Sequence, residues 1–272
     1  MPLNHFNWKR SSANKASLLI CLLAVVIAVA GCGLIDRFQA STSDSNVAST
    51  SNGNSGTTSP SQTRDNAAEG LCENEYYPVY PTMIRRYEIK GSGPAKYTLT
   101  QRDISESGFK EDRDFESGLK VTNSWLCTEE GLRTAEFTNT GVMTNARFEM
   151  ETVKSSGVTI PKDPEPGMKF DATYDVSVKV KAGPVSADAT GEVKIANAVA
   201  SVGESVEVNG QTFNTIRIDS TINVTINMRG RRIEGARVTA SNWYSKEAGL
   251  VKQETGGTFG KQFLEIVSTE RK

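Results

Sequence analysis

Histidine is almost absent from this sequence, and its absence excludes several kinds of site. The single histidine among the 272 residues is His5, in an N-terminal segment that we expect to be removed. Without an imidazole, the remaining chain cannot form a Ser-His-Asp triad, a Cys-His dyad or a His-ligated zinc site. No cysteine pair has the CxxC spacing of a redox enzyme. We find no catalytic constellation, and we predict that the protein is not an enzyme and has no cofactor or metal.

A large excess of charge of one sign is also lacking. The chain has 31 basic and 32 acidic residues, and three basic but no acidic residues precede position 32, so the rest has 28 against 32 and a net charge of −4. This mild charge gives no electrostatic reason to expect a nucleic-acid partner.

The long apolar run of the sequence lies near the N-terminus. Leu18–Ala30 is an unbroken run of 13 apolar residues that follows three basic ones. It is shorter than the roughly 20 residues that cross a bilayer, but it fits the h-region of a signal peptide. The segment Val29-Ala30-Gly31-Cys32 resembles the lipobox of bacterial lipoproteins. We therefore predict a signal peptide over 1–31, acylation of Cys32 by chains such as palmitate, and anchoring to the outward face of a membrane in the bacterial cell envelope.

Residues 32–70 form the predicted tether between this lipid anchor and a folded region over 71–272. Between Ser41 and Thr63, 13 residues are Ser or Thr. So few apolar side chains cannot offset the entropy lost on ordering, and we expect disorder. A flexible chain of this length has an end-to-end distance of roughly 30–37 Å, which lets the folded region reach away from the membrane.

Alternation of apolar and polar residues predicts an all-β domain. Every second residue is apolar from Phe170 to Val180 and, with one gap, from Ile216 to Met228. Such alternation places the apolar side chains on one face of a sheet and leaves the other face in water. Short turns favour an antiparallel meander. The predicted strands span 83–90, 95–103, 118–127, 132–138, 145–153, 170–180, 190–199, 213–228, 232–244, 249–255 and 261–269.

The strand over 213–228 would span roughly 50 Å if it were straight, which is longer than a usual strand. Its apolar row has its gap at Ser220. The strand must therefore curve or break near Ser220. A long, curved antiparallel sheet suggests a half-barrel or a barrel-like fold.

Two segments suggest an internal duplication. Residues 124–132 align with residues 242–250, with Trp, Glu, Gly and Leu coinciding. A duplication would divide the domain into halves 76–157 and 158–272, arranged in one sheet or in two facing ones. The alternative is two similar hairpins, each with Gly at its turn and Trp as a core anchor.

The order of turn and core residues over 76–272 resembles a group of bacterial envelope lipoproteins with a TapB-like domain of unknown function. That resemblance implies a relation to the half-barrel of periplasmic lipoprotein carriers and implies no activity. The sequence departs from the pattern in its first strand, where Gly and Trp would be expected near Thr82 and Arg85. The matching residues are Tyr76-Tyr77-Pro78, Pro81 with Tyr87, Trp125 with Gly131-Leu132, Pro166-Gly167 with Phe170, Thr212-Phe213 with Ile216-Arg217-Ile218, and Trp243-Tyr244 with Gly249-Leu250-Val251.

Two cysteines, Cys72 and Cys127, remain if Cys32 is acylated. An even pair outside the cytoplasm favours a disulfide, which would join the start of the domain to the strand of Trp125. The alternative is two free buried thiols.

Charged clusters are candidate binding sites, each with a simpler interpretation. Asp112, Asp114 and Glu116 share one strand face and could bind calcium, although they lack EF-hand spacing. The arginines at 229, 231 and 232 flank a hairpin tip and could contact lipid headgroups or an acidic polysaccharide. A solvated surface explains both clusters more simply.

Two carboxylate groups could suggest a glycosidase. They are Glu129 with Glu130, and Asp163 with Glu165, and both lie in turn-like segments where no cleft is implied. The sequence therefore favours a non-enzymatic lipoprotein whose curved sheet binds an apolar ligand, a lipid or a segment of an envelope protein. The alternative is a structural or adhesive surface module, and a carboxylate-based hydrolase is the weakest hypothesis.

Overall fold

The computed structural model describes residues 70–91, 95–137, 139–143, 146–182, 185–228, 230–257 and 261–271. The predicted signal peptide, Cys32 and nearly all of the tether lie outside these residues. No helix within the described ranges is long and apolar enough to cross a membrane.

The described chain is built from antiparallel strands, which confirms the predicted all-β class. Their neighbours in the sheet follow the order β6-β7-β9-β10-β11-β12-β13-β14-β1-β2-β3-β4-β5-β8. The strands are β1 (Met83–Lys90), β2 (Ala95–Arg102), β3 (Gly108–Phe115), β4 (Lys120–Thr128), β5 (Gly131–Thr134), β6 (Asn139–Met143), β7 (Ala146–Gly157), β8 (Ile160–Pro161), β9 (Lys169–Ala182), β10 (Val185–Val208), β11 (Gln211–Met228), β12 (Arg231–Ser245), β13 (Gly249–Gly257) and β14 (Gln262–Arg271).

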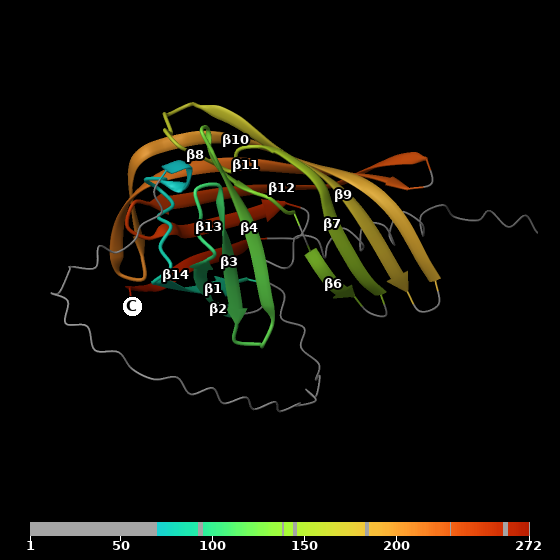
Figure 1. Ribbon diagram of the computed structural model, residues 1–272, viewed down its shortest axis with the longest axis horizontal. Helices are drawn as coiled ribbons and strands as arrows, with labels where there is room; N and C mark the ends of the chain where they lie inside the picture. The colour runs from blue at the N-terminus through green and yellow to red at the C-terminus, as the bar shows by residue number, and fades with distance from the viewer. Residues whose placement is uncertain are drawn as a thin grey trace, which may run out of the picture.

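These strands form one sheet that curves strongly without closing into a barrel (Figure 1). The last strand, β14, pairs with the first, β1, so the C-terminal run of strands continues directly into the N-terminal run. The two sides of the curved sheet approach each other near residues 158–160. There, the Val158 N–H donates to Asp171 of β9 and the Thr159 N–H donates to Leu132 of β5. The result is a half-barrel with an inner and an outer face.

Strand β11 runs without a break through Ser220, so the long strand predicted here curves instead of dividing. Its residues from Ile216 to Met228 pair with β10 on one side and β12 on the other. The Ser220 hydroxyl donates to Asn197 Oδ1 at 2.6 Å, and both side chains are buried. This hydrogen bond satisfies the polar group that interrupts the apolar row.

Several strands differ from the prediction, and β6 and β8 are not among the predicted ranges. Strand β3 is also absent from those ranges, although a strand face was considered at Asp112 and Asp114, because Glu111 and Arg113 occupy inner-face positions where alternation would require apolar residues. Strand β10 has 24 residues where ten were predicted. Register shifts near Val199 and Val202 interrupt its alternation with β11 and hide the continuation from a sequence pattern.

The segments that suggested a duplication both form hairpins in this single sheet. Gly131 opens β5 with φ 141°, and Gly249 opens β13 with φ 75°. Trp125 and Trp243 precede these turns and are buried in separate core clusters. The duplication itself stays a prediction.

Candidate functional site

Residues 70–82, called the N-terminal plug, pack against one part of the inner face. The plug places Tyr76, Tyr77 and Val79 in a core cluster with side chains of β3, β4, β11 and β12. Tyr77 lies 5.0 Å from Trp125 and 6.2 Å from Tyr244, measured between ring centroids. The plug therefore joins opposite walls of the half-barrel.

A disulfide fastens the start of the plug to the sheet. It links Cys72 to Cys127 of β4, with their Cα atoms 4.9 Å apart, as the sequence predicted. Cys72 is fully buried and Cys127 nearly so. The first residues of the plug therefore cannot leave the sheet while the disulfide is intact.

A buried carboxylate holds the middle of the plug. Glu111 of β3 is fully buried, and Tyr77 of the plug donates its hydroxyl to Glu111 Oε2. The Arg113 guanidinium donates to Glu111 Oε1 from Nη2 at 2.9 Å and from Nε at 3.1 Å. Burial, and then the charge of Glu111, raise the pKa of Tyr77 well above its ordinary value. Both carboxylate oxygens are engaged, which compensates the cost of burying the charge.

A buried cation fixes the end of the plug. Arg85 of β1 donates to the Pro78 carbonyl from Nη2 and to the Ala248 carbonyl from Nε, both at 2.6 Å. Its guanidinium also lies 5.7 Å from the centre of the Tyr77 ring. The Tyr80 N–H donates to Gln101 Oε1 at 3.0 Å. These groups are inaccessible and engaged with the plug, so they position the chain and are not exposed for catalysis.

Another part of the inner face is apolar. We call it the distal face and define it by its eight buried residues, Met150 of β7, Ala172, Tyr174, Val176 and Val178 of β9, Ala189 and Val193 of β10, and Val224 of β11. Ile195, Ile222, Ile226 and Met228 extend it as partly buried neighbours. Of the described residues outside these four strands, only Phe137 packs its side chain against the distal face.

The distal face has a polar boundary beside the plug. Ser220 and Asn197 lie at this boundary, and the plug-bound cluster of Ile216 and Ile218 begins beyond them on β11. Close to it, the Phe137 ring lies 5.6 Å from that of Tyr174, and Thr134 Oγ1 is 2.6 Å from Tyr174 Oη.

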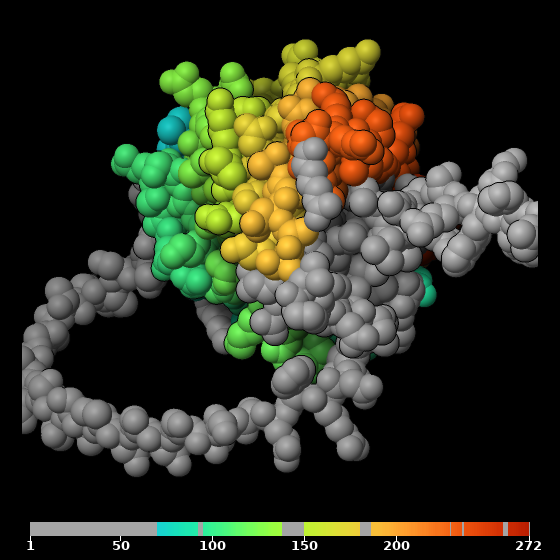
Figure 2. Space-filling view, turned by 90° about the vertical axis from the view of Figure 1, so that its right-hand side faces the viewer, coloured from blue at the N-terminus to red at the C-terminus, as the bar shows by residue number. Residues whose placement is uncertain are grey.

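The other end of the distal face is a set of hairpin tips. The strands run on to Ala182–Val185 and Met228–Arg231, and Figure 2 shows the surface at this end, with the β11–β12 tip in orange-red beside β9 and β10. The face is thus an apolar strip that leads from the plug to the hairpin tips.

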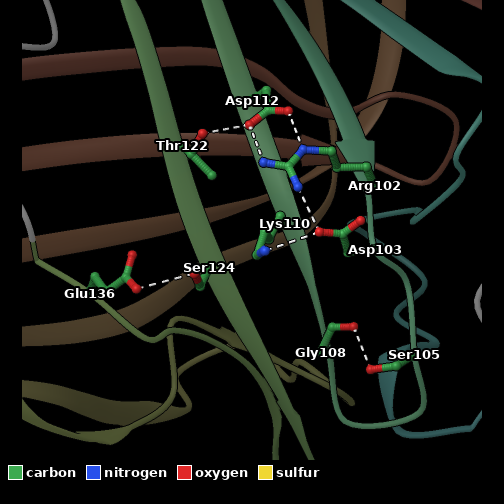
Figure 3. Close-up of polar contacts among 9 residues, drawn as sticks. All are labelled: Arg102, Asp103, Ser105, Gly108, Lys110, Asp112, Thr122, Ser124 and Glu136. Atoms are coloured by element: carbon green, nitrogen blue, oxygen red, sulfur yellow. Dashed lines mark hydrogen bonds and ion pairs between the residues drawn. The ribbon is translucent and has the colours of Figure 1, made fainter.

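Two carboxylates of the candidate calcium cluster, Asp112 and Asp114, form ion pairs on the outer face, and Figure 3 shows the contacts of Asp112; Glu116 is exposed in the turn after β3. Asp112 accepts hydrogen bonds from Arg102 Nε at 2.6 Å and from Thr122 Oγ1 at 2.6 Å. These contacts, led by Arg102, lower the pKa of Asp112. Asp114 pairs instead with Lys120 at 3.1 Å. Over the part of the chain that the structure describes, no group of three or more His, Cys, Asp or Glu residues could hold a metal ion.

The carboxylates considered for a glycosidase lie in exposed turns. Glu129 and Glu130 form the β4–β5 turn, and Asp163 and Glu165 follow β8. The Lys162 N–H donates to the Glu130 carbonyl, so the two turns are adjacent at the surface. Trp125 and Trp243, in contrast, are buried as expected of core anchors.

Sequence reasoning missed the polar contacts under the plug. The sequence patterns assign no buried role to Glu111, Arg113 or Arg85. The available signal was the alternation of strand faces, because Glu111 and Arg113 lie on the same face of β3 as the buried Phe109. A strand in which an apolar residue, a Glu and an Arg occupy successive positions of one face can indicate an ion pair with a buried carboxylate.

The comparisons place the chain in a family and add two distant structural similarities. A DUF3108-like family model matches residues 119–262. A proposed exported protein with a YmcC-like fold from Bacteroides fragilis is 11% identical, with a TM-score of 0.43, over 73% of this chain and 100% of that one. The hypothetical lipoprotein YmcC from Escherichia coli is 10% identical, with a TM-score of 0.30, over 69% and 87%.

A search of curated proteins gives no match. The relation to TapB-like domains and to lipoprotein carriers stays a prediction, and no catalytic family is indicated. Because the family match covers more than half of the sequence, the chain belongs to the DUF3108-like family.

Proposed function

We propose that the protein is an envelope lipoprotein, anchored through Cys32, that holds an acyl chain on its distal face. The observation that carries this proposal is the apolar strip over β7, β9, β10 and β11, against which the described residues place only Phe137 from outside the strands. An apolar face of this kind requires an apolar cover. The plug covers a neighbouring part of the inner face, and its disulfide keeps it there.

The distal face is long enough to hold an extended acyl chain. From Ser220 to Met228, β11 advances eight residues, or about 26 Å at the usual rise. A lipid acyl chain in one leaflet spans about half of the roughly 30 Å hydrocarbon thickness of a bilayer, which is less than the length of the distal face. Each methylene buried on the face would contribute about 0.8 kcal/mol, so a long chain would be retained without a polar contact.

The predicted anchor and tether complete the proposal. Two or three acyl chains on Cys32 would hold the protein on a membrane almost permanently. Labelling with palmitate tests this part, since a Cys32→Ala variant should lose the label and leave the detergent phase. Equal labelling of that variant would contradict the anchor without affecting the distal face.

Lipid retained by the full chain tests the distal face directly. The protein is purified from membranes, washed extensively with detergent, and its bound lipid is quantified by mass spectrometry. Ala189 is 7% exposed on the distal face, so Ala189→Trp should fill the strip and displace lipid. Ala196 is exposed on the outer face of the same strand, so Ala196→Trp is the matched control.

We expect non-covalent acyl lipid on the natural chain and on Ala196→Trp, and much less on Ala189→Trp. Equal lipid on the two tryptophan variants would mean that the lipid binds elsewhere. A natural chain without bound lipid would favour the alternative of a structural or adhesive module.

A further inference from the structure

Arg231 lies on the same side of the sheet as the distal face, at its hairpin-tip end. Arg231 opens β12, and its cross-strand partner is Met228, while Ile233 pairs with Ile226. Directly paired residues project to the same face of a sheet. Met228 and Ile226 pack against the distal cluster, so Arg231 stands at the end of the same strip.

Arg229 lies outside the described residues, and the charged residues that follow Arg231 on β12 lie on the opposite face. Arg232 pairs with Asn227 across the strands, and its Nε lies 3.6 Å from Glu234 Oε1. Arg237 pairs with Asn223, which is exposed. Between Ser220 and the hairpin tip, Arg231 is therefore the charged side chain that the described strands place on the inner face. No described residue forms an ion pair with it.

We propose that Arg231 binds the anionic head of an amphiphile whose acyl chain lies along the distal face. This inference rests on the proposed function and adds the chemical class of the ligand, a carboxylate or a phosphate joined to a single long chain. A guanidinium presents a planar fork of donors that matches both anions. Because Arg231 is exposed at the hairpin tip, the head would stay at the surface while the chain extends toward Ser220.

The arrangement combines two recognition elements on one face. The apolar strip gives retention in proportion to chain length and does not distinguish one head from another. The guanidinium distinguishes an anionic head from a neutral one, because an ion pair with two parallel hydrogen bonds forms with the first alone. Arg232, one residue away but on the outer face, cannot perform this role.

The test uses photoreactive probes on envelope vesicles that contain the full chain. Three probes share one diazirine-bearing long chain and differ in their heads, which are a carboxylate, a phosphate monoester and a neutral alcohol. Cross-linked peptides are identified by mass spectrometry, and labelling of β9 to β12 is measured against probe concentration. The variants are Arg231→Gln, Arg231→Lys and the matched control Arg232→Gln.

We expect an anionic probe to label the natural chain at a concentration about tenfold below that of the alcohol. Arg231→Gln should remove this difference, Arg231→Lys should retain much of it, and Arg232→Gln should leave it unchanged. Preference for the carboxylate would indicate a free fatty acid, and preference for the phosphate would indicate a phospholipid-type head. Either result supports the inference.

Three outcomes would overturn it. If the alcohol and the anionic probes label the natural chain equally, the acyl site stands but Arg231 does not select its head. If the Arg232→Gln variant loses as much as Arg231→Gln, the effect is general surface charge. A failure of all three probes to label the distal strands would refute the proposed function together with this inference.

Discussion

Removal of the Cys72–Cys127 disulfide tests whether the N-terminal plug belongs to the stable fold. We expect the double substitution of both cysteines by alanine to destabilise the domain strongly, because two effects combine. The disulfide closes a loop with a sequence separation of 55 residues. It also holds the plug, whose Tyr76 and Tyr77 are buried between opposite walls of the half-barrel.

The loop length sets the magnitude of the first effect. In the chain-entropy model, a cross-link that closes a loop of this size restricts the unfolded chain by about 4 kcal/mol at 25 °C. For a domain of this length, a loss of that size lowers the melting temperature by about 8–16 °C. Detachment of the plug would expose apolar area in addition, and it would do so before the rest of the sheet unfolds.

Urea and thermal unfolding of residues 70–272, followed by circular dichroism, measure this loss. Dithiothreitol supplies the control, since it should destabilise the natural domain to the level of the double variant and leave the variant itself unchanged. Loss of less than about 1 kcal/mol, or ready maleimide labelling of both thiols in the folded natural domain, would refute the reasoning.

Three further predictions concern the buried polar groups and one close backbone contact. Glu111→Gln should reduce the free energy of unfolding by about 1–3 kcal/mol, because it removes the buried charge that Arg113 and Tyr77 bind. The control Asp112→Asn on the outer face should reduce it by less than about 1 kcal/mol. Similar values for the two variants in denaturant titrations would contradict the ion pair of Glu111 with Arg113. Gly131→Ala should be more destabilising than Gly118→Ala by at least about 2 kcal/mol. Both glycines have positive φ, but only the alanine at position 131 would place its Cβ 2.2 Å from the Ile160 carbonyl oxygen. Comparable melting temperatures of the two variants would refute this close approach. Burial raises the pKa of four tyrosines, Tyr77, Tyr87, Tyr97 and Tyr244, above the ordinary value of about 10. Above that pH the folded state keeps protons that the unfolded chain loses, so the free energy of unfolding should fall as pH rises. Tyrosinate absorbance and circular dichroism should therefore change together, and full ionisation with an intact β spectrum would contradict the burial of these tyrosines.

The distal face is the most predictable part of the molecule. The alternation from Phe170 to Val180 and from Ile216 to Met228 is enough to place its apolar residues on one side of a sheet. Burial on one face fixes register, because a slip of one residue would turn every apolar side chain to water. The same logic leaves open whether the strand breaks at Ser220, since a sequence does not show that Asn197 supplies the partner for its hydroxyl.

The plug and its ion pair are much harder to predict. Residues 73–82 have no regular secondary structure to give them a period, and their contacts join segments that are distant along the chain. Tyr77 meets Glu111 across 34 residues, and Arg85 meets Ala248 across 163. Such pairings depend on how the sheet curves, which alternation within a single strand does not encode. The disulfide could be predicted because cysteine pairing depends on compartment and number as well as on geometry.

The plug covers only part of the inner face because the plug is short and strands β9 to β12 are long. The plug extends 13 residues from Gly70 to Thr82, and it is held at Cys72, Tyr77 and Pro78, so it cannot slide along the sheet. Strands β9 to β12 continue past it for many residues with the same one-sided apolar pattern. If a closed structural core were the purpose of the inner face, strands that end near Ser220 would suffice. Their extension to a hairpin tip marked by Arg231 instead favours a ligand with a long apolar chain and a charged end.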